Sequence, residues 1–318
     1  MLVCQKNIRS KFTNANREYK IVSGTIGIIG LGLMGSAFAR RLMDANFDVL
    51  GIDVSSERCD ALREAGGSVA GSLAEIGESC DTILMAVMTI AQVEEVMEKK
   101  GGLIDSFGDR AAEKIVLSTI TAEPDVLEKL AERVADKGVR FLDTPVSGTS
   151  LQVQNGDGLG LIAGDKQAIE TVQPVLDAIY PRQSYTGPAG TGTKTKLAIN
   201  HILGLNRVGL AEGLVFADRL GLDLENFLEI AKASAAYSQI MDIKGQKMVQ
   251  QDFTTVGKVV QHLKDFRIIR KQAEMHEQQL PMASMLIELL EACEKHGDGD
   301  KDNSITFEEI KRRRISKS

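Results

Sequence analysis

The sequence has no run of 18 apolar residues and no long basic stripe, and its net charge is −6. Without such an apolar run, no segment qualifies as a transmembrane helix, and we expect no membrane partner. A negative charge balance without a basic stripe also makes nucleic acids poor candidate partners. With 43% hydrophobic and 26% charged residues, the composition predicts a soluble globular protein.

Cysteine and histidine are scarce, with four residues of each. The cysteines form no C-x-x-C pair, which indicates reduced thiols in a cytoplasmic protein rather than a disulfide framework or a zinc site. The histidines show no metal-ligand spacing, so we predict no metal site. The residues concerned are Cys4, Cys59, Cys80, Cys293, His201, His262, His276 and His296.

The length of 318 residues is sufficient for two domains of ordinary size. We expect an N-terminal extension (1–23), a dinucleotide-binding domain (24–190) and a helical part (191–318). The extension carries five basic residues and one acidic residue, which is compatible with a short organelle-targeting segment. It lacks a strong apolar face, so the favoured interpretation is a disordered extension before the first strand.

From residue 24 to about residue 185, short apolar runs alternate with amphipathic stretches, which is typical of a parallel sheet with crossover helices. After residue 187 we expect only helices. The first of these would be roughly 40 Å long and would bridge the two domains. The predicted strands are Thr25–Ile29, Val49–Ile52, Thr82–Val87, Ile115–Ser118, Phe141–Leu142 and Leu159–Ala163, and the later helices are Thr193–Leu220, Leu224–Ser234, Ile240–Val249, Val256–Glu277 and Met282–Lys295.

The first predicted strand leads into a G-x-G-x-x-G turn, Gly30-Leu31-Gly32-Leu33-Met34-Gly35. Its glycines permit a tight turn, close approach of the backbone to a pyrophosphate, and close packing of helix on strand. The second strand ends in Asp53, 21 residues after Gly32. A carboxylate there can accept hydrogen bonds from the adenosine ribose and would repel a 2′-phosphate. We therefore predict a dinucleotide site that favours NAD over NADP.

Ligands of open α/β sheets bind outside the carboxyl ends of the strands, where two polar segments are expected, Ser118–Thr121 and Asp143–Thr149. The second segment offers consecutive N–H groups and two hydroxyls, which suit a carboxylate. Lys196 and Asn200 are four residues apart, so they project from one face of the long helix at the expected domain junction. Taken singly, the segment 143–149 is more often an ordinary polar turn, and a Lys–Asn pair at this spacing is more often a solvated helix face.

Taken together, these residues resemble the β-hydroxyacid dehydrogenases, the 3-hydroxyisobutyrate dehydrogenase group. The resemblance covers about residues 24–305, with four motifs in family order and at family spacing. They are Ile28–Gly35, Asp143–Gly148, Gly190-x-Gly192-x-x-x-Lys196-x-x-x-Asn200, and Lys264-Asp265. The resemblance implies an α/β fold with an N-terminal Rossmann-type doubly wound sheet, a long interdomain helix and an all-α C-terminal domain. It also implies a homodimer or homotetramer.

The resemblance further implies roles for individual residues. Lys196 would be the general acid/base, and Asn200 would orient the substrate oxygen. A small carboxylate substrate would be held by Ser147, Gly148 and Thr149, while the cofactor would meet Val87, Thr119 and Lys264. The chain departs from the family in three places. Thr149 replaces a common second glycine, Ile199 replaces the first of two asparagines, and the loop 87–89 lacks the usual proline. The changes at 149 and 199 bear on which substrate is bound rather than on the class of reaction.

The predicted function is hydride transfer between NAD and a small 3-hydroxy carboxylic acid or its semialdehyde. The alternatives are an NADP-dependent semialdehyde or glyoxylate reductase, and a non-catalytic NAD-binding module, against which the presence of Lys196 and Asn200 argues. A short-chain dehydrogenase is excluded because no Tyr-x-x-x-Lys occurs.

The segment Asp298–Glu309 has the spacing of a calcium loop. Only one flanking helix is clear, however, and residues 299–304 resemble a metal-free Gly-Asp-x-Asp-x-Ser segment of the family. Calcium binding is therefore not the favoured interpretation.

Overall fold

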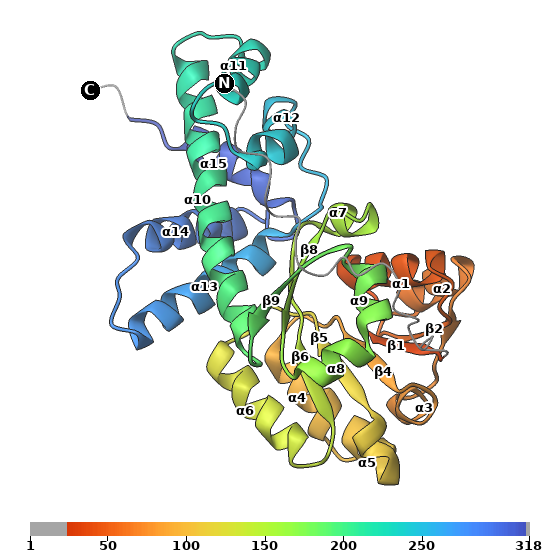
Figure 1. Ribbon diagram of the computed structural model, residues 1–318. Coiled ribbons are helices and arrows are strands. Elements are labelled where there is room, and N and C mark those ends of the chain that lie inside the picture. The colour runs from red at the N-terminus through yellow and green to blue at the C-terminus, as the bar shows by residue number, and fades with distance from the viewer. Residues whose placement is uncertain (1–23, 316–318) are drawn as a thin grey trace, which may run out of the picture.

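The computed structural model describes residues 24–315, so the extension and its targeting hypothesis lie outside the described residues. Figure 1 shows a sheet covered by helices, then the long helix α10 (Thr191–Arg219), with further helices packed along its length. The predicted fold class is confirmed: α/β, with a Rossmann-type sheet, a long bridging helix and an all-α C-terminal part. The division at residues 190 and 191, which precedes the start of α10, stays a prediction.

Within residues 24–315 the sheet has nine strands, in the order β3-β2-β1-β4-β5-β6-β8-β7, with β9 paired to β8. The first six run parallel in the order 3-2-1-4-5-6 of a Rossmann fold. The order reverses between β1 and β4, which places the ligand crevice at the carboxyl ends of these two strands. The bounds are β1 (Ile26–Ile29), β2 (Val49–Ile52), β3 (Ser68–Val69), β4 (Thr82–Met85), β5 (Ile115–Ser118), β6 (Arg140–Asp143), β7 (Val146–Ser147), β8 (Leu159–Ala163) and β9 (Arg182–Gly187).

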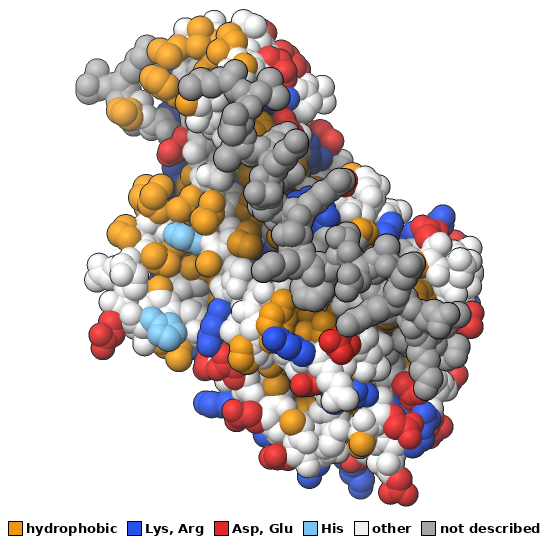
Figure 2. All heavy atoms as spheres, in the orientation of Figure 1, with side chains coloured by type: hydrophobic (Ala, Val, Ile, Leu, Met, Phe, Trp, Pro, Cys, Tyr) orange, Lys and Arg blue, Asp and Glu red, His pale blue; other side chains and the backbone are white. Residues whose placement is uncertain are grey.

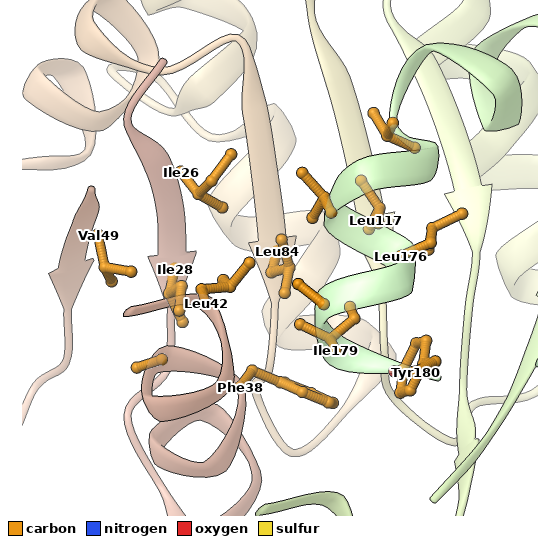
Figure 3. Close-up of a cluster of buried hydrophobic side chains, with 14 of the residues drawn as sticks. Ile26, Ile28, Phe38, Leu42, Val49, Leu84, Leu117, Leu176, Ile179 and Tyr180 are labelled. Atoms are coloured by element: carbon orange, nitrogen blue, oxygen red, sulfur yellow. The ribbon is translucent and has the colours of Figure 1, made fainter. Parts of the chain in front are cut away.

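Apolar residues along the strands alternate between two cores, one on each face of the sheet. Ile28, Leu84 and Leu117 pack with α1 and α9, whereas neighbouring apolar residues pack with α3, α4 and α6. Figure 3 shows the first core, where the rings of Phe38 and Tyr180 meet edge to face with centroids 5.6 Å apart. Burial on both faces explains the continuous apolar runs in the sequence. The helices of this part are α1 (Leu33–Asp44), α2 (Ser56–Glu64), α3 (Leu73–Ser79), α4 (Ile90–Glu98), α5 (Leu103–Phe107), η1 (Gly108–Glu113), α6 (Pro124–Ala135), α7 (Ser150–Gln154), α8 (Lys166–Thr171) and α9 (Gln173–Ile179).

The helical part packs against one side of α10. Gly204 allows α13 to come close, because a Cβ at this position would overlap the ring of Phe266 and approach Leu286 to 2.9 Å. Phe266 and Leu286 belong to a separate apolar core between α10, α13 and α14. The elements after α10 are α11 (Leu224–Ala233), η2 (Met241–Gly245), α12 (Gln246–Val249), α13 (Val259–Met275), α14 (Pro281–Lys295), η3 (Asn303–Ile305) and α15 (Thr306–Arg312).

Several elements differ from the sequence predictions. The short strands β3 and β7 and the largely exposed strand β9 carry no apolar run that would reveal them. The helix predicted from Val256 begins at Val259, because the preceding backbone turns to donate N–H groups to Asp302. The predicted helix Ile240–Val249 begins with the π-helical turn η2.

No helix among the described residues is long and apolar enough to cross a membrane. Cys59, Cys80 and Cys293 are buried free thiols, whereas Cys4 lies outside the described residues. Burial raises the pKa of Cys80 to about 11 and the pKa of Cys293 to about 12. Both thiols are therefore protonated and unreactive at neutral pH.

Candidate active site

The glycine turn lies at the carboxyl end of β1, beside the end of β4. Gly30 has a φ of +93°, and a Cβ there would lie 2.7 Å from the carbonyl oxygen of Ala86. A Cβ at Gly35 would overlap the carbonyl oxygen of Gly30. By contrast, a Cβ at Gly32 would meet only the guanidinium of Arg58, at 4.0 Å. Packing within the protein thus requires Gly30 and Gly35, whereas the space at Gly32 suits an incoming pyrophosphate.

Helix α1 starts directly after Gly32, which supplies no side-chain cap. The N–H groups of its first turn are therefore available to a ligand, and the helix dipole favours a negative one. A cavity of about 530 Å³ opens beside this turn and is lined by Gly32, Leu33 and Arg58, among others. The residues present fit a dinucleotide phosphate.

Asp53, at the end of β2, is tied to the glycine turn. Its carboxylate accepts hydrogen bonds from the backbone N–H groups of Leu31 at 2.6 Å and Ser55 at 2.9 Å. The guanidinium of Arg58 lies 3.3 Å from the same carboxylate. Burial acts to raise the pKa of Asp53, but the two backbone hydrogen bonds and Arg58 outweigh it and lower the pKa overall. Asp53 is therefore ionised at neutral pH, with a cation directly beside it.

Val87 and Thr119 follow β4 and β5, and β4 borders the point where the sheet order reverses. Val87 is partly buried and packs against the second core. The backbone N–H and hydroxyl of Thr119 both donate to the carbonyl oxygen of Met85, at 3.0 and 2.8 Å. The hydroxyl proton of Thr119 is therefore used within the protein, which leaves its oxygen lone pairs for a ligand.

Asp143 connects the sheet to the long helix. From the end of β6, its carboxylate accepts hydrogen bonds from the backbone N–H groups of Gly190 at 3.1 Å and Thr193 at 2.8 Å, and from the Thr193 hydroxyl at 2.8 Å. These groups belong to the first turn of α10, so Asp143 caps that helix from outside. Burial raises the pKa of Asp143 to about 6, against the effect of these hydrogen bonds. The cap sets where α10 begins, one turn before Lys196.

Lys196 and Asn200 are both on the buried side of α10, with 8% and 7% of their surface exposed. The amide nitrogen of Asn200 donates to Asp265 of α13 at 3.0 Å. This bond fixes the Asn200 side chain and brings a carboxylate into the neighbourhood of Lys196.

The protonation of Lys196 is strongly perturbed. Burial lowers its pKa from 10.5 to about 8, opposed by the negative charge of Asp265 and assisted by the positive charges of Arg207 and Lys264. An amine with this pKa can both donate and accept a proton near neutral pH.

Lys264 joins the helical part to the sheet. Its ammonium donates to the carbonyl oxygens of Thr121 at 2.7 Å and Met88 at 3.3 Å, in the loops after β5 and β4. The same ammonium lies 3.0 Å from the carboxylate of Asp265. A continuous set of contacts thus runs from these two loops through Lys264 and Asp265 to Asn200.

The predicted carboxylate-binding segment follows β6. Ser147 ends β7 and pairs with Leu159, and Gly148 has a φ of +155°. Thr149 caps α7: its hydroxyl accepts from the backbone N–H of Gln152 at 3.2 Å, and the Gln152 side chain accepts from the N–H of Thr149 at 2.9 Å. The threonine found in place of a second glycine therefore has a local structural role as a helix cap.

Comparison with known proteins agrees with this arrangement. Residues 25–187 match the family model described as the NAD binding domain of 6-phosphogluconate dehydrogenase, which covers just over half of the chain. Residues 190–309 match the model described as NAD-binding of NADP-dependent 3-hydroxyisobutyrate dehydrogenase. The chain belongs to the β-hydroxyacid dehydrogenase family. It is thus an NAD(P)-dependent oxidoreductase acting on CH–OH groups.

Individual relatives of this chain carry different substrate names. Glyoxylate/succinic semialdehyde reductase 2, chloroplastic, of Arabidopsis thaliana is 30% identical over 90% of this chain and 79% of its own length. L-threonate dehydrogenase of Cupriavidus necator is 28% identical over 89% of this chain and 95% of its own. The crystal structure of a 3-hydroxyisobutyrate dehydrogenase from Salmonella typhimurium superposes with a TM-score of 0.81 at 24% identity, over 90% of this chain and 99% of that one.

The acidic segment Asp298–Glu309 supports the fold. Asp302 is fully buried, and its carboxylate accepts from the Lys244 ammonium at 2.7 Å and from the backbone N–H of Val256 at 3.0 Å. Asp298 and Glu309 both pair with Arg312. The carboxylates that would bind calcium are thus already paired with cations and N–H donors. Within residues 24–315 no group of three or more His, Cys, Asp or Glu residues could hold a metal ion.

One buried pair near the site was not anticipated from the sequence. Arg207 and His262 are each 7% exposed, and Nη1 of Arg207 lies 2.7 Å from Nε2 of His262. Burial, together with Arg207 and other nearby cations, lowers the pKa of His262 well below its usual value, so His262 is neutral. The signal available in the sequence was spacing, since Arg207 follows Asn200 by seven residues and shares its helix face.

Proposed function

We propose that this enzyme transfers hydride between NAD and a small 3-hydroxy carboxylic acid, or reduces the corresponding semialdehyde, with Lys196 as general acid/base. The observation that carries this proposal is the set of contacts from the loops after β4 and β5, through Lys264 and Asp265, to Asn200. Because a Rossmann fold binds its ligand at the carboxyl ends of these strands, the contacts support a position of Lys196 and Asn200 near the nicotinamide. The names of the relatives support a hydroxy acid or aldehyde acid as substrate.

The bound nicotinamide supplies or accepts the hydride. In the reducing direction, protonated Lys196 donates its proton to the carbonyl oxygen, and at a pKa of about 8 most of the amine is protonated at pH 7. In the oxidising direction, neutral Lys196 removes the hydroxyl proton. Asn200, held by Asp265, would orient the reacting oxygen. Ser147, Gly148 and Thr149 would bind the substrate carboxylate.

The choice between NAD and NADP depends on Asp53 and Arg58. The ionised carboxylate of Asp53 would repel a 2′-phosphate, which supports NAD. Arg58 favours the second candidate, an NADP-dependent semialdehyde or glyoxylate reductase, because its guanidinium lies 3.3 Å from that carboxylate and offsets its charge. An Arg58→Met variant should raise the ratio of kcat/KM with NAD to kcat/KM with NADP. An unchanged ratio would remove Arg58 from cofactor selection.

We also propose that the enzyme is a cytoplasmic homodimer or homotetramer. Figure 2 shows hydrophobic side chains gathered over the helical part, on the side where α10 and α14 lie in Figure 1. These two helices carry exposed hydrophobic side chains, Ile202 and Phe216 on α10 and Met282 and Met285 on α14, which are 59% to 65% exposed. Such a surface suits a second copy of the chain. Light scattering of the purified protein tests this. The cytoplasmic location rests on the cysteine pattern and stays a prediction.

The experiment that tests the proposed function follows absorbance at 340 nm with NAD(H) and NADP(H). The panel contains 3-hydroxy acids, L-threonate, glyoxylate and succinic semialdehyde, with the full chain and its Lys196→Met variant. We expect turnover of at least one substrate and a loss of about 10²–10⁴-fold in the variant, which retains cofactor binding. Cofactor binding without any turnover would instead support a non-catalytic module.

A further inference from the structure

The cavity beside the glycine turn has a second wall, which comes from the helical part. Its volume of about 530 Å³ is typical of small-ligand sites. Gly32, Leu33 and Arg58 contribute to its lining from the sheet-containing part, and Thr255 and Lys258, just before α13, contribute from the helical part. The helical part therefore presents a cation to the same space that the glycine turn opens.

The acidic segment near the C-terminus holds this second wall in place. Asp302 accepts the backbone N–H groups of Val256 at 3.0 Å and Gly257 at 3.1 Å. The hydroxyl of Thr255 donates to the carbonyl oxygen of Asp300 at 2.8 Å. Because Asp302 is itself fully buried, the backbone that carries Lys258 has a defined position. The motif that resembles a calcium loop thus serves as a support for the cavity wall.

The ammonium of Lys258 pairs with the carboxylate of Asp300 at 2.6 Å, with the side chains 38% and 85% exposed. An ion pair this exposed contributes little to stability, so the ammonium can exchange its partner at small cost. On the opposite wall, the positive charge of Arg58 is offset by Asp53 at 3.3 Å. Lys258 is therefore a side chain from which a phosphate group in this cavity would gain charge neutralisation.

We propose that Lys258 binds a phosphate of the dinucleotide, so that the cofactor is held from both walls of the cavity. The inference rests on the proposed function, because it requires that a dinucleotide occupies the glycine turn. The pyrophosphate, and the 2′-phosphate of NADP, present the same chemistry to an ammonium. Asp300 competes with the cofactor for Lys258.

The test is isothermal titration of the full chain with NADH and with NADPH. Lys258→Met removes the charge, and Lys258→Arg restores it. Lys301→Met is the matched control, because Lys301 is a neighbouring cation that pairs with Asp298 at 2.9 Å, away from the cavity wall. We expect Kd to rise about tenfold in Lys258→Met and to change less than twofold in Lys301→Met and Lys258→Arg. Asp300→Asn should lower Kd.

The two cofactors identify the phosphate. An equal rise in Kd for NADH and NADPH assigns Lys258 to the pyrophosphate, and a rise for NADPH alone assigns it to the 2′-phosphate. A Kd within twofold of wild type for both cofactors in Lys258→Met overturns the proposal. Failure of the wild-type chain to bind either cofactor would be a different result, because it would refute the proposed function itself.

Discussion

The perturbed pKa of Lys196 leads to a specific prediction about the pH dependence of catalysis. Burial, with the help of two cations, lowers this pKa from 10.5 to about 8. At 1.36 kcal/mol per unit, the 2.5-unit difference (10.5 − 8) corresponds to about 3 kcal/mol of preference for the neutral amine. For alcohol oxidation, kcat/KM should therefore rise about tenfold per pH unit below pH 8 and level off above it.

The informative perturbation is Asp265→Asn. The carboxylate of Asp265 is the negative charge that raises the pKa of Lys196, and it is shared with Lys264 at 3.0 Å. The amide oxygen of an asparagine can still accept the hydrogen bond from Asn200, so the main change is electrostatic. A close opposite charge shifts a pKa by about 1–3 units. Because Asp265 also pairs with Lys264, we expect its removal to lower the pKa of Lys196 by about one unit. The pH at which kcat/KM stops rising, which we call the rising limb of the profile, should thus move from about pH 8 to about pH 7.

The assay is kcat/KM for the oxidation of the best 3-hydroxy acid, measured from pH 6 to pH 10 in buffers of constant ionic strength. Asp125→Asn is the control, because Asp125 accepts from Gln272 of α13 at 2.8 Å in the same contact between the two parts of the chain. It should leave the limb unchanged. A wild-type limb above pH 10, or an identical limb in Asp265→Asn, would refute the assignment of the limb to Lys196.

Three further predictions follow from single contacts. Lys196→Met should lower turnover about 10²–10⁴-fold and stabilise the fold by up to about 3 kcal/mol at neutral pH. This gain in stability disappears above pH 10.5, where the lysine is neutral in both states, and urea unfolding at pH 7 and pH 11 checks it. Gly35→Ala should destabilise the fold, because its Cβ overlaps the carbonyl oxygen of Gly30. Gly32→Ala should keep the melting temperature and weaken only NADH binding. Calorimetry and isothermal titration test this pair, and the same result for both variants would refute the prediction. Asp143→Ala leaves buried N–H groups at the start of α10 unpaired, so it should lower the free energy of unfolding by about 2–4 kcal/mol and also lower kcat. An unchanged melting temperature would exclude the capping role of Asp143.

The sequence was sufficient to predict the parts of the fold that depend on local pattern. The parallel strands appear as continuous apolar runs because both faces of the sheet are buried. The short strand β7 and the exposed strand β9 have no such runs, and their pairing with β8 depends on residues distant in the chain. Val256 belongs to an apparently helical pattern, but its N–H donates to Asp302, and the helix begins only at Val259.

The candidate site likewise has features that the sequence predicts and features that only the tertiary structure decides. Spacing along the chain was enough to place Gly32 at a helix start, Lys196 and Asn200 on one helix face, and Asp53 at a strand end. Only the tertiary structure decided that Asp265 holds Asn200, that burial brings the pKa of Lys196 to about 8, and that Lys258 faces the glycine turn across a cavity. The physical reason is the separation along the chain over which each effect acts. Backbone periodicity acts over a few residues, whereas burial and charge depend on which segments the fold brings together, and Gly32 and Lys258 are more than two hundred residues apart in the chain.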